Sequence, residues 1–203
     1  MSHFLDGKKL AVIGDPIEHS LSPLIQQAML DALGLACVYE RIRVPAGTAS
    51  AWLPGAASMN LAGFNATMPH KTDLVPLMDT LSDDARMYRS VNTVVIRDGR
   101  FHGDNTDGAG FLHALHDEGI RPEGRHVVVF GAGGAARSVV LKLASEGAAS
   151  VTVCCRTPSK AEALVKGSDR VHVAALGGQD ALKALGKAEL FINCTPLGMQ
   201  GVP

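Results

Sequence analysis

A glycine-rich segment between a strand and a helix constrains the fold of this chain more than any other feature. Gly131-Ala132-Gly133-Gly134-Ala135-Ala136 follows the buried-strand pattern of residues 126–130 and opens a helical pattern at residues 135–146. In the pattern G-x-G-x-x-G/A, the first glycine permits a tight turn, the second lets the backbone approach a pyrophosphate, and the small third residue lets the helix pack on the strand. An ordinary glycine-rich turn is the alternative, but the strand–turn–helix context favours a dinucleotide site.

Strands and helices alternate along the rest of the sequence, which indicates an α/β fold with parallel strands and helices on both faces. We predict strands at residues 10–13, 38–44, 61–66, 91–97, 100–103, 126–130, 151–155, 170–174 and 190–194. We predict helices that begin at Ser22, Thr67, Gly108 and Ala135. In the first helix Ser22 is the expected N-cap, Pro23 the first helical residue and Gly34 the C-cap. Five residues line one face of that helix: Leu24, Ile25, Ala28, Met29 and Leu33.

Asp98-Gly99 separates two strand-like runs and is a strong signal for a β-hairpin. A two-residue turn sets Arg97 opposite Arg100. Counting outward along the two strands then brings Asn92 and Asp107 to the same end of the hairpin.

We place a domain boundary near Gly108, with an N-terminal α/β domain of mainly parallel sheet at residues 1–107 and an incomplete Rossmann domain at residues 108–203. Hydrophobic residues make up 46% and charged residues 19% of the sequence, which is typical of globular proteins. The 19 basic and 20 acidic residues balance without a basic stripe, so a nucleic-acid partner is disfavoured and a small molecule is expected.

The four cysteines lack the spacing of a disulfide framework or a metal site and are expected to be reduced. His113 and His116 have no Cys or carboxylate partners nearby in sequence, so no metal site is predicted. We see no signal peptide and no apolar run of the ~20 residues that a membrane helix needs. The chain is therefore expected to be cytoplasmic.

The segment after the strand at residues 151–155 indicates which dinucleotide is preferred. An acidic residue there would favour NAD by binding the ribose 2′-hydroxyl. The segment instead reads Cys155-Arg156-Thr157-Pro158-Ser159-Lys160, with no acid before Glu162. Arg156 can pair with a 2′-phosphate, Lys160 adds charge, and two hydroxyls can donate hydrogen bonds. We therefore predict NADP, with Cys155, Arg156, Thr157, Ser159 and Lys160 as binding residues; a solvated surface Arg156 is the alternative.

Several polar segments, in order along the chain, resemble those of the shikimate dehydrogenase family and its quinate/shikimate relatives. They are residues 14–23, 63–71, 90–94 and 103–108, together with the glycine segment at 131–136 and Asn193-Cys194-Thr195-Pro196-Leu197-Gly198-Met199. The resemblance runs from about Leu10 to the end of the sequence.

The resemblance implies NADPH-dependent reduction of 3-dehydroshikimate to shikimate, a step in aromatic amino-acid biosynthesis. It implies that Ser20 and Ser22 bind the substrate carboxylate. Residues implied to bind the ring hydroxyls and the reacting oxygen are Thr67, Lys71, Asn92 and Asp107, of which Lys71 and Asp107 form the catalytic pair. Asp83 is implied to lie near the nicotinamide, and Thr195 to contact the cofactor.

The chemistry of the pair is independently sensible, because hydride delivery to a ketone leaves an alkoxide that must be stabilised and protonated. A lysine beside an aspartate can do both. Without the resemblance, Lys71 would be taken for an exposed first-turn residue and Asp107 for a turn or N-cap residue.

The family continues beyond the length of this sequence, with further Rossmann strands and a final helical segment that supplies a Tyr and a Gln to the substrate. We therefore expect weak or absent turnover if the chain ends at Pro203. Two other functions stay open: a quinate/shikimate dehydrogenase, and a non-catalytic module that binds NADP or a metabolite. The oligomeric state is expected to be a monomer or homodimer.

Overall fold

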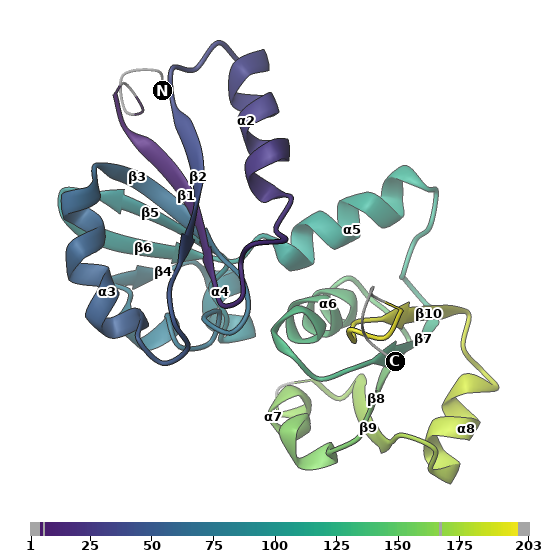
Figure 1. Cartoon of the computed structure of the whole chain (residues 1–203). Helices are drawn as coiled ribbons and strands as arrows, with labels where there is room; N and C mark the ends of the chain where they lie inside the picture. The colour runs from purple at the N-terminus through teal and green to yellow at the C-terminus, as the bar shows by residue number, and fades with distance from the viewer. Residues whose placement is uncertain (1–4, 6, 167, 199–203) are drawn as a thin grey trace. The chain divides into compact units, whose positions relative to one another are not determined.

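The computed structural model describes residue 5, residues 7–166 and residues 168–198. The chain divides into two compact units, Met1–Thr106 and Asp107–Pro203 (Figure 1). Each unit has its own sheet and its own core, and the predicted α/β class is confirmed.

The first unit is built on a six-stranded sheet of order β2-β1-β3-β5-β6-β4. Its strands are β1 (Lys9–Gly14), β2 (Val38–Arg43), β3 (Leu61–Ala66), β4 (Thr80–Leu81), β5 (Thr93–Arg97) and β6 (Arg100–Asp104). The β1–β2, β1–β3 and β4–β6 pairs are parallel, whereas the β3–β5 and β5–β6 pairs are antiparallel. The predicted hairpin is confirmed, since Arg97 pairs with Arg100 across Asp98-Gly99, and both turn residues have positive φ.

Alternation of side chains along β1 places apolar residues on both faces of this sheet. Ala11 and Ile13 pack with α3 (Ala49–Ala56), whereas Val12 packs with Leu30 of α2 (Ser22–Ala32). The two helices therefore lie on opposite faces of the sheet (Figure 1).

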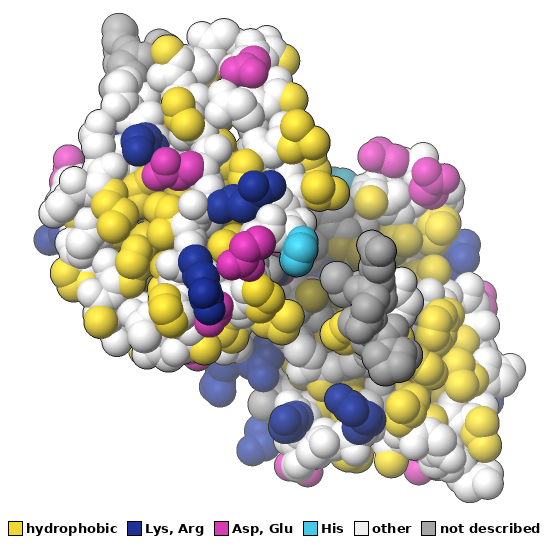
Figure 2. All heavy atoms as spheres, in the orientation of Figure 1, with side chains coloured by type: hydrophobic (Ala, Val, Ile, Leu, Met, Phe, Trp, Pro, Cys, Tyr) yellow, Lys and Arg dark blue, Asp and Glu magenta, His cyan; other side chains and the backbone are white. Residues whose placement is uncertain are grey.

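The apolar face expected for α2 does not pack into the core of the first unit. Leu24, Ile25, Met29 and Leu33 are each more than half exposed, and part of this surface is visible along α2 in Figure 2. Leu30 is the buried residue of the helix. Ser22 is also not the N-cap but the first helical residue, whereas Gly34 follows the helix with positive φ as expected.

The prediction of a helix beginning at Thr67 is wrong. Successive turns follow β3 and lead to the 3₁₀ helix η2 (Val75–Leu77), because Pro69 and Pro76 each remove a backbone donor. Three short elements of this unit carry no strong sequence signal: α3, the 3₁₀ helix η1 (Ala57–Met59) and α4 (Asp83–Tyr88). Ser82 caps α4 by accepting a hydrogen bond from the Ala85 amide at 3.1 Å.

The second unit contains a four-stranded parallel sheet of order β10-β7-β8-β9. Its strands are β7 (His126–Phe130), β8 (Ser150–Cys155), β9 (Val171–Ala175) and β10 (Leu190–Asn193). Its helices are α5 (Asp107–Asp117), α6 (Gly134–Ser145), the 3₁₀ helix η3 (Pro158–Lys160), α7 (Glu162–Val165) and α8 (Gln179–Leu185).

The two faces of the second sheet are covered by different helices. Val127, Val129 and their neighbours pack with α6, whereas Val128, Cys154 and Ala174 pack with Ala181 of α8. This division follows from the period of two along each strand. It gives the second unit three layers.

Within the described ranges, no helix has the length and apolar character needed to cross a membrane. All four cysteines, Cys37, Cys154, Cys155 and Cys194, carry free thiols. Lys and Arg side chains are scattered over the face shown in Figure 2 rather than gathered in one stripe.

Candidate active site

The carboxyl ends of β1 and β3 meet at one edge of the first sheet and hold the segments that follow them together. The Thr67 amide donates to the Ile13 carbonyl at 2.9 Å, and the Asp15 amide donates to the Met68 carbonyl at 3.1 Å. A Cβ at Gly14 would lie 2.6 Å from Thr67 Cγ2, so glycine is required for this close approach. Thr67 is therefore fixed against the loop that carries Ser20 and Ser22.

Asn92 and Lys71 belong to the same edge. Because β5 runs antiparallel to β3, the residue before β5 lies beside the end of β3, and the Ala66 amide donates to the Asn92 carbonyl at 2.8 Å. The Val91 amide donates to the Lys71 carbonyl at 2.7 Å. Asn92 is buried and Lys71 is half-buried. Turns rather than a helix thus bring Lys71 next to the start of β5.

A series of side-chain hydrogen bonds, here called the Tyr39 network, crosses this edge from β2 to the end of β6. Tyr39 donates to Asn65 Oδ1 at 2.7 Å, and Asn65 Nδ2 donates to Thr93 Oγ1 at 3.0 Å. Thr93 donates to Asn92 Oδ1 at 2.9 Å, and the Thr106 amide donates to the same oxygen at 3.0 Å. Asn92 Nδ2 donates to Thr106 Oγ1 at 3.1 Å. The amide of Asn92 is therefore held in one orientation.

Burial raises the pKa of Tyr39 to about 12. The hydroxyl of Tyr39 thus stays protonated near neutral pH and can donate to Asn65. A deprotonated phenol would leave two acceptors facing each other at this point of the network.

The loop with Ser20 and Ser22 is held from β2. Arg41 donates to the Ser20 carbonyl from both Nε and Nη2, at 3.0 and 2.7 Å. The Ser22 amide donates to Ser20 Oγ at 3.3 Å. Both serines are half-buried.

A second contact from β2 anchors the start of the same loop. Asp15 accepts hydrogen bonds from Arg43 Nε at 2.9 Å and from the Ala46 amide at 3.1 Å. These bonds lower the pKa of Asp15 below its ordinary value. His70, which is fully buried, donates from Nε2 to the Val44 carbonyl at 2.8 Å. The residues before Lys71 are therefore anchored to the end of β2.

The structure places the two remaining acidic candidates on helices. Asp107 is the half-buried first residue of α5 and belongs to the second unit, whereas the preceding Thr106 belongs to the first. Asp83 is the first residue of α4; its side chain is 98% exposed and lies 3.5 Å from Arg86. The contacts of Asp83 are thus those of a first-turn acid on a helix.

In the second unit, the glycine segment lies where the carboxyl ends of β7 and β10 meet. Gly131 has a φ of 107°, and its amide donates to the Cys154 carbonyl at 3.0 Å. A Cβ at Gly131 would lie 2.9 Å from the Cys194 carbonyl oxygen and 3.1 Å from Thr195 Cγ2. Both conformation and space therefore require glycine at this position.

The other two positions of the motif differ from the first. Ala136 is fully buried and packs between α6 and the sheet, as the small third residue should. Gly133 precedes α6 with an ordinary φ of −78°, and a Cβ there would meet nothing within 4 Å. The fold itself therefore does not require a glycine at Gly133.

Two further segments flank the glycine turn. After β8, the residues Arg156, Thr157, Ser159 and Lys160 are all exposed, whereas the Cys155 side chain is buried in the core. After β10, Asn193 Oδ1 accepts hydrogen bonds from the amide and hydroxyl of Thr195, at 3.0 and 2.6 Å. The last residue of the family-like motif in this segment, Met199, lies outside the described residues.

Sequence reasoning did not identify the residues that hold these candidates in place: Tyr39, Arg41, Asn65, Thr106 and Asn193. Asn65, Thr106 and Asn193 lie inside the segments that carry the family resemblance, so their position is a usable signal. Tyr39 and Arg41 lie in a strand that shows only its alternation, and no local pattern indicates their partners. Among the described residues, no group of three or more His, Cys, Asp or Glu side chains could hold a metal ion.

Comparison with known families agrees with both units. Residues 12–94 match the family model of the shikimate dehydrogenase substrate binding domain. Residues 116–197 match the model of shikimate / quinate 5-dehydrogenase.

Individual relatives match nearly the whole chain. The shikimate dehydrogenase (NADP(+)) of Alkaliphilus metalliredigens is 42% identical over 196 residues, covering 94% of this chain and 68% of the relative. That of Geobacter metallireducens is 45% identical over 201 residues, covering 94% of this chain and 69% of the relative.

Solved structures give the same result. The shikimate dehydrogenase of Aquifex aeolicus superposes with a TM-score of 0.88 at 32% identity, covering 96% of this chain and 71% of that one. The shikimate 5-dehydrogenase of Thermus thermophilus, solved in complex with NADP(H) and shikimate, has a TM-score of 0.82 at 34% identity, covering 93% of this chain and 69% of that one. The chain belongs to the shikimate dehydrogenase family.

Proposed function

We propose that this protein catalyses the reversible, NADPH-dependent reduction of 3-dehydroshikimate to shikimate. The observation that carries the proposal is the meeting of Thr67, Lys71 and Asn92 at one edge of the first sheet, beside the loop with Ser20 and Ser22. Family membership supports the reaction, since the curated relatives are NADP(+)-dependent shikimate dehydrogenases.

For the substrate, we assign its carboxylate to the hydroxyls of Ser20 and Ser22. Arg41 and the Ser22 amide orient Ser20, so its hydroxyl hydrogen can be directed outward while Ser20 Oγ accepts from the amide. Thr67 and Asn92 would bind ring hydroxyls, because a hydroxyl and a primary amide can each donate and accept. The fixed orientation of Asn92 favours one arrangement of hydroxyls on the ring.

For the reaction, we assign Lys71 and Asp107 as the catalytic pair. The ammonium of Lys71 would stabilise the negative charge that develops on the carbonyl oxygen and supply a proton to it. The carboxylate of Asp107 would orient that ammonium and bind a neighbouring hydroxyl. Asp83 is the least supported assignment, since its exposed pairing with Arg86 accounts for its position.

The second unit has features that fit NADP. The amino end of α6 offers backbone N–H groups and a favourable dipole for a pyrophosphate, and the space at Gly133 lets a phosphate approach the backbone. Arg156, Thr157, Ser159 and Lys160 are exposed, so a 2′-phosphate can reach them. Gly131, Ala132, Gly134, Ala135 and Thr195 would complete this surface. When bound, NADPH supplies the hydride.

A spectrophotometric assay tests the function directly. We expect NADPH formation with shikimate and NADP⁺, slower reaction with NAD⁺, and slower reaction with quinate. A faster reaction with quinate than with shikimate would identify the protein as a quinate dehydrogenase. Tight NADPH and shikimate binding without turnover, measured by calorimetry, would support a non-catalytic binding module instead.

We also propose a cytoplasmic location and a monomeric or homodimeric state. The four free thiols fit a reducing compartment. Light scattering after size-exclusion chromatography measures the oligomeric state, and a tetramer would contradict this part of the proposal.

A further inference from the structure

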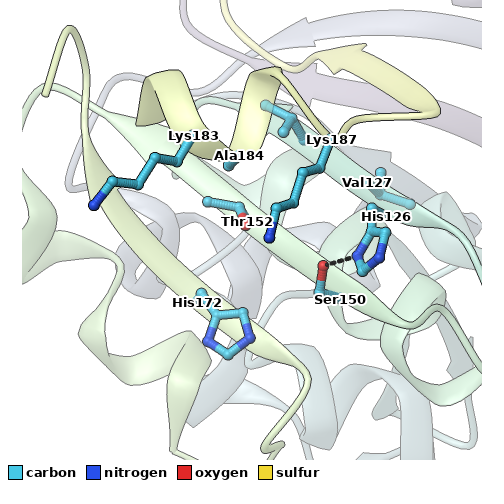
Figure 3. Close-up of a pocket in the computed structure, with 9 residues that line it drawn as sticks. His126, Val127, Ser150, Thr152, His172, Lys183, Ala184 and Lys187 are labelled. Atoms are coloured by element: carbon cyan, nitrogen blue, oxygen red, sulfur yellow. Dashed lines mark hydrogen bonds between the residues drawn. The ribbon is translucent and has the colours of Figure 1, made fainter. Parts of the chain in front are cut away.

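A cavity of about 200 Å³ lies between α8 and the strands of the second sheet (Figure 3). It is lined by His126, Val127, Val128, Ser150, Thr152, His172, Lys183, Ala184 and Lys187. None of these residues belongs to the glycine segment or to the segments that flank it.

The cavity lies toward the amino ends of the strands. His126 and Ser150 are the first residues of β7 and β8, and they are paired in register. Phe130, the last residue of β7, lies roughly 13 Å further along the strand at about 3.3 Å per residue, and the glycine segment begins after it. The cavity is thus at the opposite end of the sheet from the proposed cofactor site.

The sheet face under α8 changes character along its length. Near the carboxyl ends of the strands it is apolar, where Cys154 and Ala174 pack with Ala181 of α8. Toward the amino ends the same face carries polar side chains, and a hydrogen bond of 2.8 Å joins His126 Nδ1 to Ser150 Oγ. Packing against α8 therefore explains the apolar end but not the polar end.

Basic side chains surround the polar end. Lys187, in the turn after α8, reaches over the strands toward Ser150, whereas Lys183 of α8 points to the other side (Figure 3). No carboxylate lines the cavity in the part of the chain that the structure describes.

Two carboxylates contact residues that line the cavity. Asp180 is 3.5 Å from Lys183, and both side chains are mostly exposed, so the pair is strongly screened. Glu189 accepts a hydrogen bond from the His126 backbone amide at 3.0 Å. Neither carboxylate belongs to the lining of the cavity.

We propose that this cavity binds a small oxyanion of the phosphate class, either inorganic phosphate or the phosphate group of a phosphate monoester. Lys187, and Lys183 after it turns from Asp180, would supply charge-assisted hydrogen bonds. Ser150, Thr152 and the two histidines would donate from the sheet. A bound anion would join α8 and the turn after it to β8 and β9. The ligand would therefore stabilise the second unit.

The test is titration of the whole chain with inorganic phosphate, and separately with a phosphate monoester, followed by two-dimensional NMR. We expect saturable shifts of the His126 and His172 imidazoles and of the α8 amides, together with a rise in thermal stability. A K183Q/K187Q variant should weaken binding about tenfold or more, since each charge-assisted bond contributes about 1.5–3 kcal/mol. Saturation by the monoester at clearly lower concentration than phosphate would identify the ester as the ligand.

The matched control is R121Q/K166Q, which removes the same charge from exposed residues of the second unit, in the connector before β7 and in the turn after α7. This variant should bind phosphate within about twofold of the parent, as surface substitutions away from a site change free energies by about 0.5 kcal/mol or less. If both variants lose phosphate affinity equally, the loss reflects the change in net charge and the proposal is overturned. Shifts confined to the glycine segment and Arg156, or no saturable shifts, would also overturn it.

Discussion

The two edges that carry the candidate residues are built in different ways. In the first unit, side chains hold side chains: the Tyr39 network fixes Asn92, and Arg41 fixes the Ser20 loop. In the second unit, backbone conformation shapes the edge. Gly131 adopts a positive φ close to the Cys194 carbonyl, and the side chains of Arg156 and its neighbours are exposed.

This difference fits what each edge would bind. A hydroxylated ring must be recognised by its pattern of donors and acceptors, which requires side chains with fixed orientation. A pyrophosphate can be bound by backbone N–H groups at a helix terminus, which requires space and a defined backbone conformation. Conservative substitutions that remove a hydrogen bond should therefore weaken substrate binding in the first unit. In the second unit, substitutions that add volume should weaken cofactor binding or destabilise the fold.

The largest effect is expected from Lys71→Ala, which should lower turnover by about 10²–10⁴-fold, because the proposed general acid and its charge are both lost. Cofactor affinity, measured by NADPH fluorescence, should stay nearly unchanged, since the change lies in the first unit. Lys9→Ala, in the same unit but paired with Glu40 on the surface, is the control and should retain activity. If Lys71→Ala also loses NADPH binding, the two edges do not have separate roles in binding substrate and cofactor.

Next in size is the contrast between Gly131→Ala and Gly133→Ala. The first places a Cβ against backbone at positive φ and should destabilise the fold by about 1–3 kcal/mol, as measured by urea denaturation. The second adds a methyl group in open space, so stability should change by less than about 0.5 kcal/mol while NADPH affinity falls about tenfold. Unchanged NADPH affinity in Gly133→Ala would mean that no phosphate approaches the backbone there.

Arg156→Ala should weaken NADP⁺ binding about 10- to 100-fold, since charge-assisted hydrogen bonds contribute about 1.5–3 kcal/mol. NAD⁺ lacks the 2′-phosphate, and its affinity should change by less than about twofold. Calorimetric titration of the parent and the variant with both dinucleotides gives the ratio of NADP⁺ to NAD⁺ affinity. If the two affinities fall together, Arg156 contributes to the adenosine or pyrophosphate rather than to the 2′-phosphate.

The smallest effect is expected from Tyr39→Phe, which removes one hydrogen bond from the network and leaves the ring in place. We expect KM for shikimate to rise about fivefold, which corresponds to about 1 kcal/mol, with little change in kcat. Arg97→Ala, on the hairpin of the same sheet and away from the network, should leave both constants unchanged. An unaltered KM in Tyr39→Phe would show that the remaining bonds suffice to orient Asn92.

Much of the scaffold follows from local patterns in the sequence. The glycine motif, the strands that flank it and the Asp98-Gly99 turn each depend on residues close in sequence, and the structure contains all of them. The helix expected at Thr67 failed because caps and prolines near the start of a helix also occur in successive turns. The misplaced apolar face of α2 shows that periodicity identifies a helix face but not its partner.

The supports of the candidate site were less predictable. Tyr39 meets Asn65 across 26 residues, and Arg41 meets Ser20 across 21 residues. Such pairs are decided by strand order and register, which no local window contains. The candidate residues lie in segments that resemble those of the family. The residues that hold them in place lie on neighbouring strands, and only the pairing of β2, β1 and β3 brings them together.

The Tyr39 network also has an evolutionary consequence. Because each of its members satisfies the next, the effects of substitutions at Asn65, Thr93 and Asn92 should not add, and a change tolerated in one background would be harmful in another. Altered substrate preference in this lineage would then require coordinated replacement of several members. Such epistasis confines the accessible mutational routes to those that rebuild the hydrogen bonds together.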